Sequence, residues 1–303
     1  MSRESALRFW RAMSFPTIAD LDQKLFTEYD VDVMRAHKDM IVNDKISEDA
    51  LSSLIRGQSH LADRLVLWQY EALVDDLETR HNLDPISARY LVLDRIEEFE
   101  EFLVYQMKYA WRRHLSAFLR RSEVELEGMD YSVADGATLQ RALGFVDLVA
   151  FTDRSNQMAP PQLVDFIQTF EYAARDVITT KGARVVKTLG DAVLYVADDV
   201  STGAEVVTEI VHALKSIPGM PDVRASLVWD KVVSRFGDIF GPAVNRASRL
   251  AGVGEPGQVL LDAPTARAVA NLPGGKWTVT RGDSHDLQGL GWTETFELRP
   301  YEG

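Results

Sequence analysis

Apolar residues in the first 121 positions recur mostly at helical spacing. Between Leu93 and Leu119 they return every three or four residues, as on one face of a long amphipathic helix. Asp84 and Pro85 are typical of a helix cap and first turn, so this helix should begin there. Weaker patterns predict further helices over residues 17–30, 31–43, 46–56 and 59–80. We therefore expect an all-helical domain over residues 1–121.

The sequence changes character near residue 128. Residues 122–137 are acidic and contain Gly128 and Gly136, which predicts a linker or, alternatively, a helical extension of the preceding domain. From residue 138 to 303, strand and helix patterns alternate. Strands are predicted at 139–149, 183–187, 192–196, 223–229, 259–261, 277–280 and 295–298, and helices at 160–181, 199–215 and 242–251. This order predicts an α+β domain with a mostly antiparallel sheet.

Composition and charge narrow the classes of function. The 303 residues suffice for two domains, and a hydrophobic fraction of 46% is ordinary for a globular protein. There is no cysteine, which excludes disulfides, thiolate catalysis and cysteine-ligated zinc. The net charge of -13 and the absence of a basic footprint argue against nucleic acid as a partner. The N-terminus lacks an apolar signal core, and no apolar run reaches the ~20 residues of a membrane span, so we expect a cytoplasmic protein.

Two aspartates are candidates for a functional site because of their positions in the predicted strands. Asp147 interrupts an apolar strand, where a charge is costly unless it is paired or lies at a strand end in water. Asp191 follows Gly190 in the turn of the predicted hairpin, a position that an ordinary turn residue would also fill. If the strand lies beside the hairpin, the two carboxylates converge. Such a pair suits Mg²⁺, which takes phosphate oxygens as further ligands, and two ions would assist chemistry at a phosphate.

A third segment of interest runs from Gly237 to Arg249. Asn245 and Arg249 are four residues apart and share a face of the predicted helix. An amide and a guanidinium at this spacing would orient a sugar and meet a phosphate. A capped helix with an exposed arginine explains the same residues without a function, so this segment alone leaves both interpretations open.

Together, the three segments resemble the catalytic domain of class III nucleotide cyclases over residues 138–299. The resemblance implies a ferredoxin-like βαββαβ core with added C-terminal elements, preceded here by the all-helical domain. It implies that Asp147 and Asp191 bind two ions of Mg²⁺ or Mn²⁺. It also implies that Phe151 and Thr152, in the turn after the first strand, belong to the substrate site.

The resemblance also assigns the residues that recognise the nucleotide. Lys187 and Asp238 match the pair that reads adenine, since a lysine donates to the ring N1 and an aspartate accepts from the exocyclic amine. A guanine reader needs the opposite polarity, commonly Glu and Cys in this family, so ATP is favoured over GTP. Asn245 matches the residue that positions the ribose. Arg249 matches the one that stabilises charge at the α-phosphate.

The activity implied is that of an adenylate cyclase. The ribose 3′-hydroxyl of ATP attacks the α-phosphate, which yields cyclic AMP and pyrophosphate. In this family the site lies between two catalytic domains, so a chain that holds the full set should form a head-to-tail homodimer. A guanylate cyclase and a catalytically degenerate nucleotide-binding module are the alternative interpretations. Two features depart from the family pattern: residues 229–237 are short for a dimerisation arm, as in a compact bacterial subgroup, and Gln288 stands where lysine is common.

Residues 1–121 resemble the helical regulatory domain that precedes some actinobacterial-type cyclases. That resemblance implies autoinhibition, a response to pH and a pocket for a fatty acid or another apolar ligand. Four histidines in this region would titrate near neutral pH and suit a pH switch, although scattered surface or core histidines without a function also explain them: His37, His60, His81 and His114. Four large side chains would form helix-packing core or, alternatively, a lipid pocket: Phe99, Phe102, Met107 and Trp111.

Overall fold

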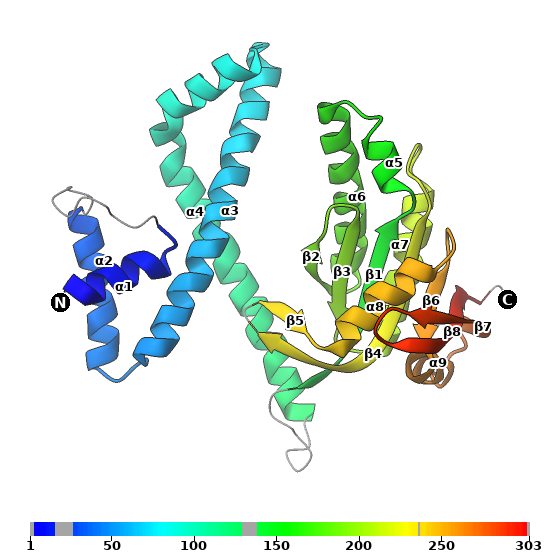
Figure 1. Cartoon of the computed structure of the whole chain (residues 1–303). Coiled ribbons are helices and arrows are strands. Elements are labelled where there is room, and N and C mark those ends of the chain that lie inside the picture. Colours follow the sequence, from blue (N-terminus) through cyan, green and yellow to red (C-terminus); the bar gives the residue numbers. More distant parts are fainter. Residues whose placement is uncertain (1–2, 16–26, 129–137, 236, 302–303) are drawn as a thin grey trace. The chain divides into compact units, whose positions relative to one another are not determined.

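The computed structural model of the chain describes residues 3–15, 27–128, 138–235 and 237–301. Internal contacts divide the chain into two compact units, Met1–Met129 and Asp130–Gly303. The first unit is helical, and the second is a sheet with helices packed on it (Figure 1). Within the described ranges, none of the helices is long and apolar enough to cross a bilayer.

The helices of the first unit begin at capping residues. Its elements are α1 (Arg3–Ala12), α2 (Glu28–Val42), α3 (Glu48–His81) and α4 (Pro85–Gly128). Thr27 and Asp30 form a capping box at the start of α2, and the Ser47 side chain caps α3. The Asp84 carboxylate accepts the amides of Ile86 and Ser87 at 3.1 Å each. The predicted start of the long helix at Asp84 and Pro85 is therefore confirmed.

Several predicted helix boundaries are wrong. The segments 46–56 and 59–80 form one helix, α3, because a single interior glycine such as Gly57 costs only about 1 kcal/mol. The break between 17–30 and 31–43 is also wrong, since α2 begins at Glu28 behind its cap; residues 16–26 lie outside the described residues. Helix α1 was not predicted. Residues 122–128 continue α4, as in the alternative to a linker, and 129–137 lie outside the described residues.

Helix α4 packs on α3 over only part of its length. Val74 and Leu77 of α3 and Ala88 and Val92 of α4 form the buried cluster between the two helices. Three large side chains expected in the core or in a lipid pocket are exposed instead, because they lie beyond this contact: Phe102 at 62%, Met107 at 45% and Trp111 at 61%. Helix α4 thus presents apolar surface that its own unit leaves uncovered.

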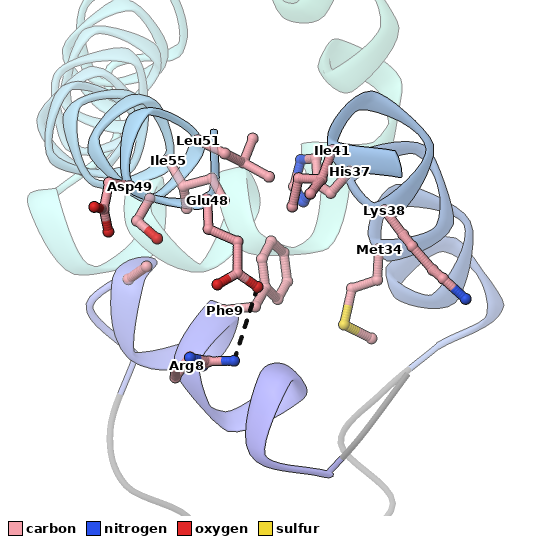
Figure 2. Close-up of a pocket in the computed structure, with 12 residues that line it drawn as sticks. Arg8, Phe9, Met34, His37, Lys38, Ile41, Glu48, Asp49, Leu51 and Ile55 are labelled. Carbon is pink, nitrogen blue, oxygen red and sulfur yellow. Dashed lines mark ion pairs between the residues drawn. The ribbon is translucent and has the colours of Figure 1, made fainter. Parts of the chain in front are cut away.

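A pocket of about 390 Å³ lies among α1, α2 and α3 (Figure 2). Its apolar lining includes Phe9, Met34 and Ile55. The His37 ring lies 5.4 Å from the Phe9 ring, and burial lowers the pKa of His37. This pocket is built from residues other than the four large side chains of α4 singled out in the sequence.

The second unit has the predicted ferredoxin-like core. Its elements are β1 (Leu139–Leu148), α5 (Phe151–Ser155), α6 (Pro160–Thr180), β2 (Arg184–Thr188), β3 (Ala192–Ala197), α7 (Val200–Lys215), β4 (Val223–Arg235), β5 (Asp238–Phe240), α8 (Pro242–Val253), β6 (Val259–Asp262), α9 (Ala263–Ala270), β7 (Trp277–Leu287) and β8 (Gly291–Pro300). The sheet order is β2-β3-β1-β4-β6-β8-β7, and β5 pairs with β4. β1 is antiparallel to both neighbours, and β4 and β6 are parallel. The short elements α5, β5 and α9 were not predicted, and β7 and β8 are longer than expected.

Strand β1 separates two apolar cores because its side chains alternate between the faces of the sheet. Ala142 and Val146 belong to the core that includes α6, α7 and α9. Leu143 and Phe145 belong to the core that includes α8. The same alternation places Asp147 on the α8 face.

The centre of β1 is glycine because of a buried tyrosine. Tyr195 is fully buried, and its hydroxyl donates to the Gly203 carbonyl at 2.7 Å. A Cβ added at Gly144 would lie 1.9 Å from the Tyr195 ring. Only glycine leaves room for this ring beside the strand that carries Asp147.

The substitution Gly144→Ala should lower the free energy of unfolding by about 3 kcal/mol, because it displaces the ring and breaks the Tyr195 hydrogen bond. Urea denaturation followed by circular dichroism measures this change. Gly252→Ala is the matched control, since nothing lies within 4 Å of its added Cβ, and it should change stability by less than about 1 kcal/mol. Equal unfolding midpoints for the two variants would contradict the packing argument.

Candidate active site

Asp147 and Asp191 are brought together by the pairing of β1 with β3. Asp147 lies opposite Ala192, and the Leu148 amide donates to the Asp191 carbonyl at 2.9 Å. Gly190, with a φ of +68°, makes the turn before β3, so Asp191 lies at the hairpin tip. The charge of Asp191 contributes to the raised pKa of Asp147, after burial. The predicted convergence of the two carboxylates is thus consistent with the backbone register and with their electrostatic coupling.

The partner of Asp147 is Arg224, which stands directly opposite it on β4. Arg224 Nε donates to Asp147 Oδ2 at 2.7 Å, and Nη2 forms an ion pair with the same oxygen at 2.6 Å. Arg224 Nη1 donates to the Gly252 carbonyl at the end of α8, at 3.1 Å. The Asp147 side chain is only 15% exposed. Of the two explanations for a charge in this strand, the structure therefore favours pairing over a strand end in water.

Opposing effects set the pKa of Asp147. Burial raises it most, the hydrogen bond and charge of Arg224 lower it, and the charge of Asp191 raises it again. The net pKa lies above the ordinary value for aspartate. A cation placed between the two carboxylates would offset both the burial and the mutual repulsion.

The donor set fits a cation that shares its ligands with a substrate. In the part of the chain that the structure describes, no group of three or more His, Asp or Glu side chains gathers as a metal site. Asp147 and Asp191 thus supply two carboxylates and leave positions for phosphate oxygens. Mg²⁺ and Mn²⁺ prefer such oxygen ligands, and Mg²⁺ is commonly held by one or two carboxylates with a nucleotide.

Lys187 and Asp238 form an ion pair, although 51 residues separate them. A register shift between Val185 and Lys187 marks a bulge in β2, and Asp238 opens β5. Lys187 Nζ lies 2.6 Å from Asp238 Oδ2, and the Ile239 amide donates to Asp238 Oδ1 at 2.7 Å. Burial opposes ionisation of Asp238, but these hydrogen bonds and the charges of Lys187 and Arg184 lower its pKa overall. The pair presents a donor and an acceptor side by side.

Helix α8 carries the other two predicted residues. Gly241, with a φ of 142°, and Pro242 start the helix, and Ala243, Ala247 and Leu250 fix its buried face. The opposite side carries Asn245, which is exposed, and Arg249, which is half-buried. Arg249 Nη1 donates to Gln288 Oε1 at 2.9 Å. Both predicted side chains thus lie on the surface of a helix that the core holds in place.

Phe151 and Thr152 begin the short helix α5, directly after β1. The Phe151 ring stacks on Phe166 with 6.1 Å between ring centroids, so its side chain packs against α6. The Thr152 carbonyl accepts the Ser155 hydroxyl at 3.0 Å. The described contacts of these two residues are packing and local hydrogen bonds within the turn beside Asp147.

Comparison with known proteins places this architecture in a family. No model of a protein family matches the chain. The chain is 35% identical to an adenylate cyclase of Glutamicibacter nicotianae over 312 residues, which cover 100% of this chain and 77% of that protein. It is also 35% identical to an adenylate cyclase of Streptomyces coelicolor over 266 residues, 86% of this chain and 67% of that protein. This chain belongs to the adenylate cyclase family.

One solved structure is similar to about half of the cyclase. It is the catalytic core of a rhodopsin-guanylyl cyclase with converted specificity, in complex with ATPαS. It covers 54% of this chain and 97% of its own, with 20% identity and a TM-score of 0.49. The family membership rests on the sequence relatives, which span both units of this cyclase.

Arg224 was not singled out in the sequence of the cyclase. It stands in the strand pattern Val223-Arg224-Ala225-Ser226-Leu227, where a charge alternates into a buried face. The signal is the same as for Asp147: each charge is costly alone and acceptable beside its opposite. Pairing the two predicted strands, β1 and β4, in their antiparallel register would have revealed the contact.

The substitution Lys187→Met should raise the pKa of Asp238, because it removes the cation and hydrogen bond that favour the carboxylate. Titration of the Asp238 carboxyl carbon by NMR measures the shift. Since the folded pKa of Asp238 is lowered, its stabilising effect is present above the unfolded value of about 3.9 and is lost as the pH falls through the folded value. The stability difference between wild type and variant should therefore shrink in acid.

Lys276→Met is the matched control for this titration, since Lys276 Nζ pairs with Glu205 at 2.6 Å, far from Asp238 in sequence. It should leave the pKa of Asp238 unchanged. An Asp238 titration that is the same in Lys187→Met and in wild type would show that the ion pair does not set this pKa.

Proposed function

We propose that this adenylate cyclase converts ATP to cyclic AMP and pyrophosphate at sites shared by two copies of the chain. The observation that carries the proposal is the complete residue set in one chain: Asp147, Asp191, Lys187, Asp238, Asn245 and Arg249. In the proposed reaction the ribose 3′-hydroxyl attacks the α-phosphate, a new P–O bond forms, and the bond to the leaving pyrophosphate breaks. The hydroxyl proton passes to water or to a phosphate oxygen.

Asp147 and Asp191 are proposed to hold two ions of Mg²⁺ or Mn²⁺. Once bound, the ions would favour deprotonation of the 3′-hydroxyl and neutralise charge on the phosphate oxygens. Arg224 keeps the Asp147 carboxylate ionised and oriented through its hydrogen bond and ion pair. Its guanidinium also places a cation beside the position proposed for the triphosphate.

The Lys187–Asp238 pair is proposed to recognise adenine. Lys187 Nζ carries three N–H donors and the Asp238 carboxylate only accepts, which complements the N1 acceptor and the amine donor of adenine. Guanine presents the opposite pattern at these edges, so the pair disfavours the guanylate cyclase alternative. The two proposed metal-binding aspartates and the two residues of α8, Asn245 and Arg249, are all present, which disfavours a catalytically degenerate binding module. Asn245 would then orient the ribose, and Arg249 would stabilise charge on the α-phosphate.

Exposed apolar side chains support a homodimer. On the second unit, Leu189, Phe240 and Trp292 are exposed near the hairpin tip, on β5 and on β8. On α4, exposed apolar residues follow one another at helical spacing: Tyr90, Leu93, Val104, Met107, Trp111 and Phe118. Apolar surface of this extent in a soluble chain is typical of protein interfaces. A second copy that covers it would also bring Asn245 and Arg249 to the other chain's aspartates.

The shared site predicts complementation between inactive variants. Asp191→Asn and Arg249→Ala should each lower cyclic AMP formation from ATP by at least about 100-fold, since each removes a charge at the reacting phosphate. Co-expressed at equal amounts, the two should recover about a quarter of wild-type activity, because half of the dimers carry one intact site of two. The assay measures cyclic AMP with Mg²⁺ or Mn²⁺, beside a parallel assay with GTP.

Asp176→Asn is the control for these variants, because Asp176 is exposed on α6 and lies outside the proposed site. It should retain full activity alone, and an equal mixture with Asp191→Asn should give about half of wild-type activity, because every site that lacks the mutated aspartate position remains intact. A mixture as inactive as its two parents would contradict the shared site, and full activity of Asp191→Asn would contradict its role as a metal ligand.

We propose that the first unit regulates the second, with the pocket among α1, α2 and α3 as the place where a signal acts (Figure 2). Its apolar lining and volume suit the acyl chain of a fatty acid. The charged groups around His37 are Arg8, Lys38, Glu48 and Asp49, and Arg8 lies 4.0 Å from Glu48. Since burial lowers the pKa of His37, the ring is neutral near pH 7 and takes up a proton only in acid. Protonation of His37 would then place a positive charge beside the apolar lining of the pocket and weaken the binding of an acyl chain there.

If the first unit inhibits, the fragment 129–303 should form cyclic AMP faster than the whole chain near neutral pH. Its activity should also respond less to a change from about pH 8 to about pH 5, because the fragment lacks His37. Cyclic AMP assays of both proteins across this range test the prediction, with gel filtration to establish that the fragment dimerises. A dimeric fragment with equal or lower activity at every pH would exclude inhibition.

A further inference from the structure

We propose that Gln288 is a positioning residue for Arg249, and that its side-chain carbonyl holds the guanidinium in the orientation that meets the α-phosphate. The inference deepens the proposed function and rests on the role proposed there for Arg249. Arg249 Nη1 donates to Gln288 Oε1 at 2.9 Å, between two residues 39 positions apart in the chain. The contact joins α8 to the turn between β7 and β8.

The turn fixes the backbone at Gln288. The Leu290 amide donates to the Leu287 carbonyl at 2.8 Å and closes the turn. Gly289 and Gly291 adopt φ angles of +77° and +72°, which other residues rarely adopt. Gln288 therefore leaves this turn in a defined direction, even though its side chain is exposed.

The turn and the helix share one apolar core. Leu287 is buried in the same cluster as Ala247, Leu250 and Ala251 of α8. Because close-packed side chains fix the separation of the elements that carry them, this cluster sets the distance from Gln288 to the helix surface. Leu287, directly before Gln288, and Leu250, directly after Arg249, are thus both buried in the core beneath this hydrogen bond.

A neutral acceptor suits an arginine that acts on phosphate. The carboxamide oxygen orders the guanidinium and leaves its positive charge intact, whereas a carboxylate would cancel it. Arginine carries five N–H donors, so one bond to Gln288 leaves others for a substrate. Holding the guanidinium before ATP arrives reduces the rotamer entropy lost in the transition state. The lysine common at this position in the family would repel Arg249.

The substitution Gln288→Met tests the inference, because methionine keeps the length of the side chain and lacks the carbonyl acceptor. We expect kcat to fall about tenfold, because the guanidinium must then be ordered in the transition state at a cost comparable to one hydrogen bond. KM for ATP should stay within about twofold, since Gln288 acts through Arg249. Steady-state cyclic AMP assays on the full-length chain measure both constants.

Two further variants separate positioning from a general structural effect. Gln162 Oε1 accepts the Ala159 amide at the start of α6, so Gln162→Met removes a glutamine hydrogen bond elsewhere and should leave kcat unchanged. In an Arg249→Lys background, where the guanidinium is absent, adding Gln288→Met should change kcat by less than about twofold, because the coupled partner is already gone.

The outcomes distinguish this inference from the proposed function. If Arg249→Lys lowers kcat strongly while Gln288→Met leaves it at the wild-type value, the positioning role fails and the role of Arg249 stands. If Gln288→Met costs the same tenfold in both backgrounds, Gln288 acts independently of Arg249 and the inference is overturned. If Arg249→Lys retains full activity, the role proposed for Arg249 fails.

Discussion

The active-site end of the sheet depends on one cross-strand ion pair, between Asp147 and Arg224. A carboxylate in an interior strand of a sheet, only 15% exposed, would be costly without a partner. Antiparallel pairing of β1 with β4 places an arginine directly opposite, and the alternation of side chains sends both residues to the α8 face. The same guanidinium binds the last turn of α8 through the Gly252 carbonyl. One contact therefore ties together the proposed metal ligand, the sheet and the helix that carries Asn245 and Arg249.

One face of the sheet contributes mainly to stability, and the border of the other face carries the candidate site. The face covered by α6, α7 and α9 holds the larger apolar core, including Tyr195 beneath Gly144. The α8 face holds a smaller core, and its border carries the charged residues of the site. Because the large core holds β1 and β3 in register, the small face can carry a carboxylate whose pKa is raised by burial. The cost of burying this carboxylate is thus offset by packing on the opposite side of the sheet.

Most elements of the second unit could be predicted from the sequence because their signals are local. The apolar runs around Asp147, the glycine turn before Asp191 and the start of α8 at Pro242 each predict their own element. Arg224 was not singled out, and the contact of Gln288 with Arg249 was not predicted, because these contacts join residues 77 and 39 positions apart and are revealed only by the register and the packing. In the helical unit, Gly57 suggested a break that α3 does not have. The apolar period of α4 predicted the helix correctly, but the same period cannot say which stripe faces a neighbour in the chain.

The two arginines of the site show how an acidic chain handles a polyanion. Arg224 is paired with a carboxylate, so its charge mainly keeps Asp147 ionised. Arg249 is held by a neutral carboxamide, so its charge is available for a ligand. With a net charge of -13, the chain offers no general attraction to ATP. Binding of ATP must then come from a few positioned cations. The partner of each arginine decides whether its charge stabilises a carboxylate of the protein or is available to the substrate.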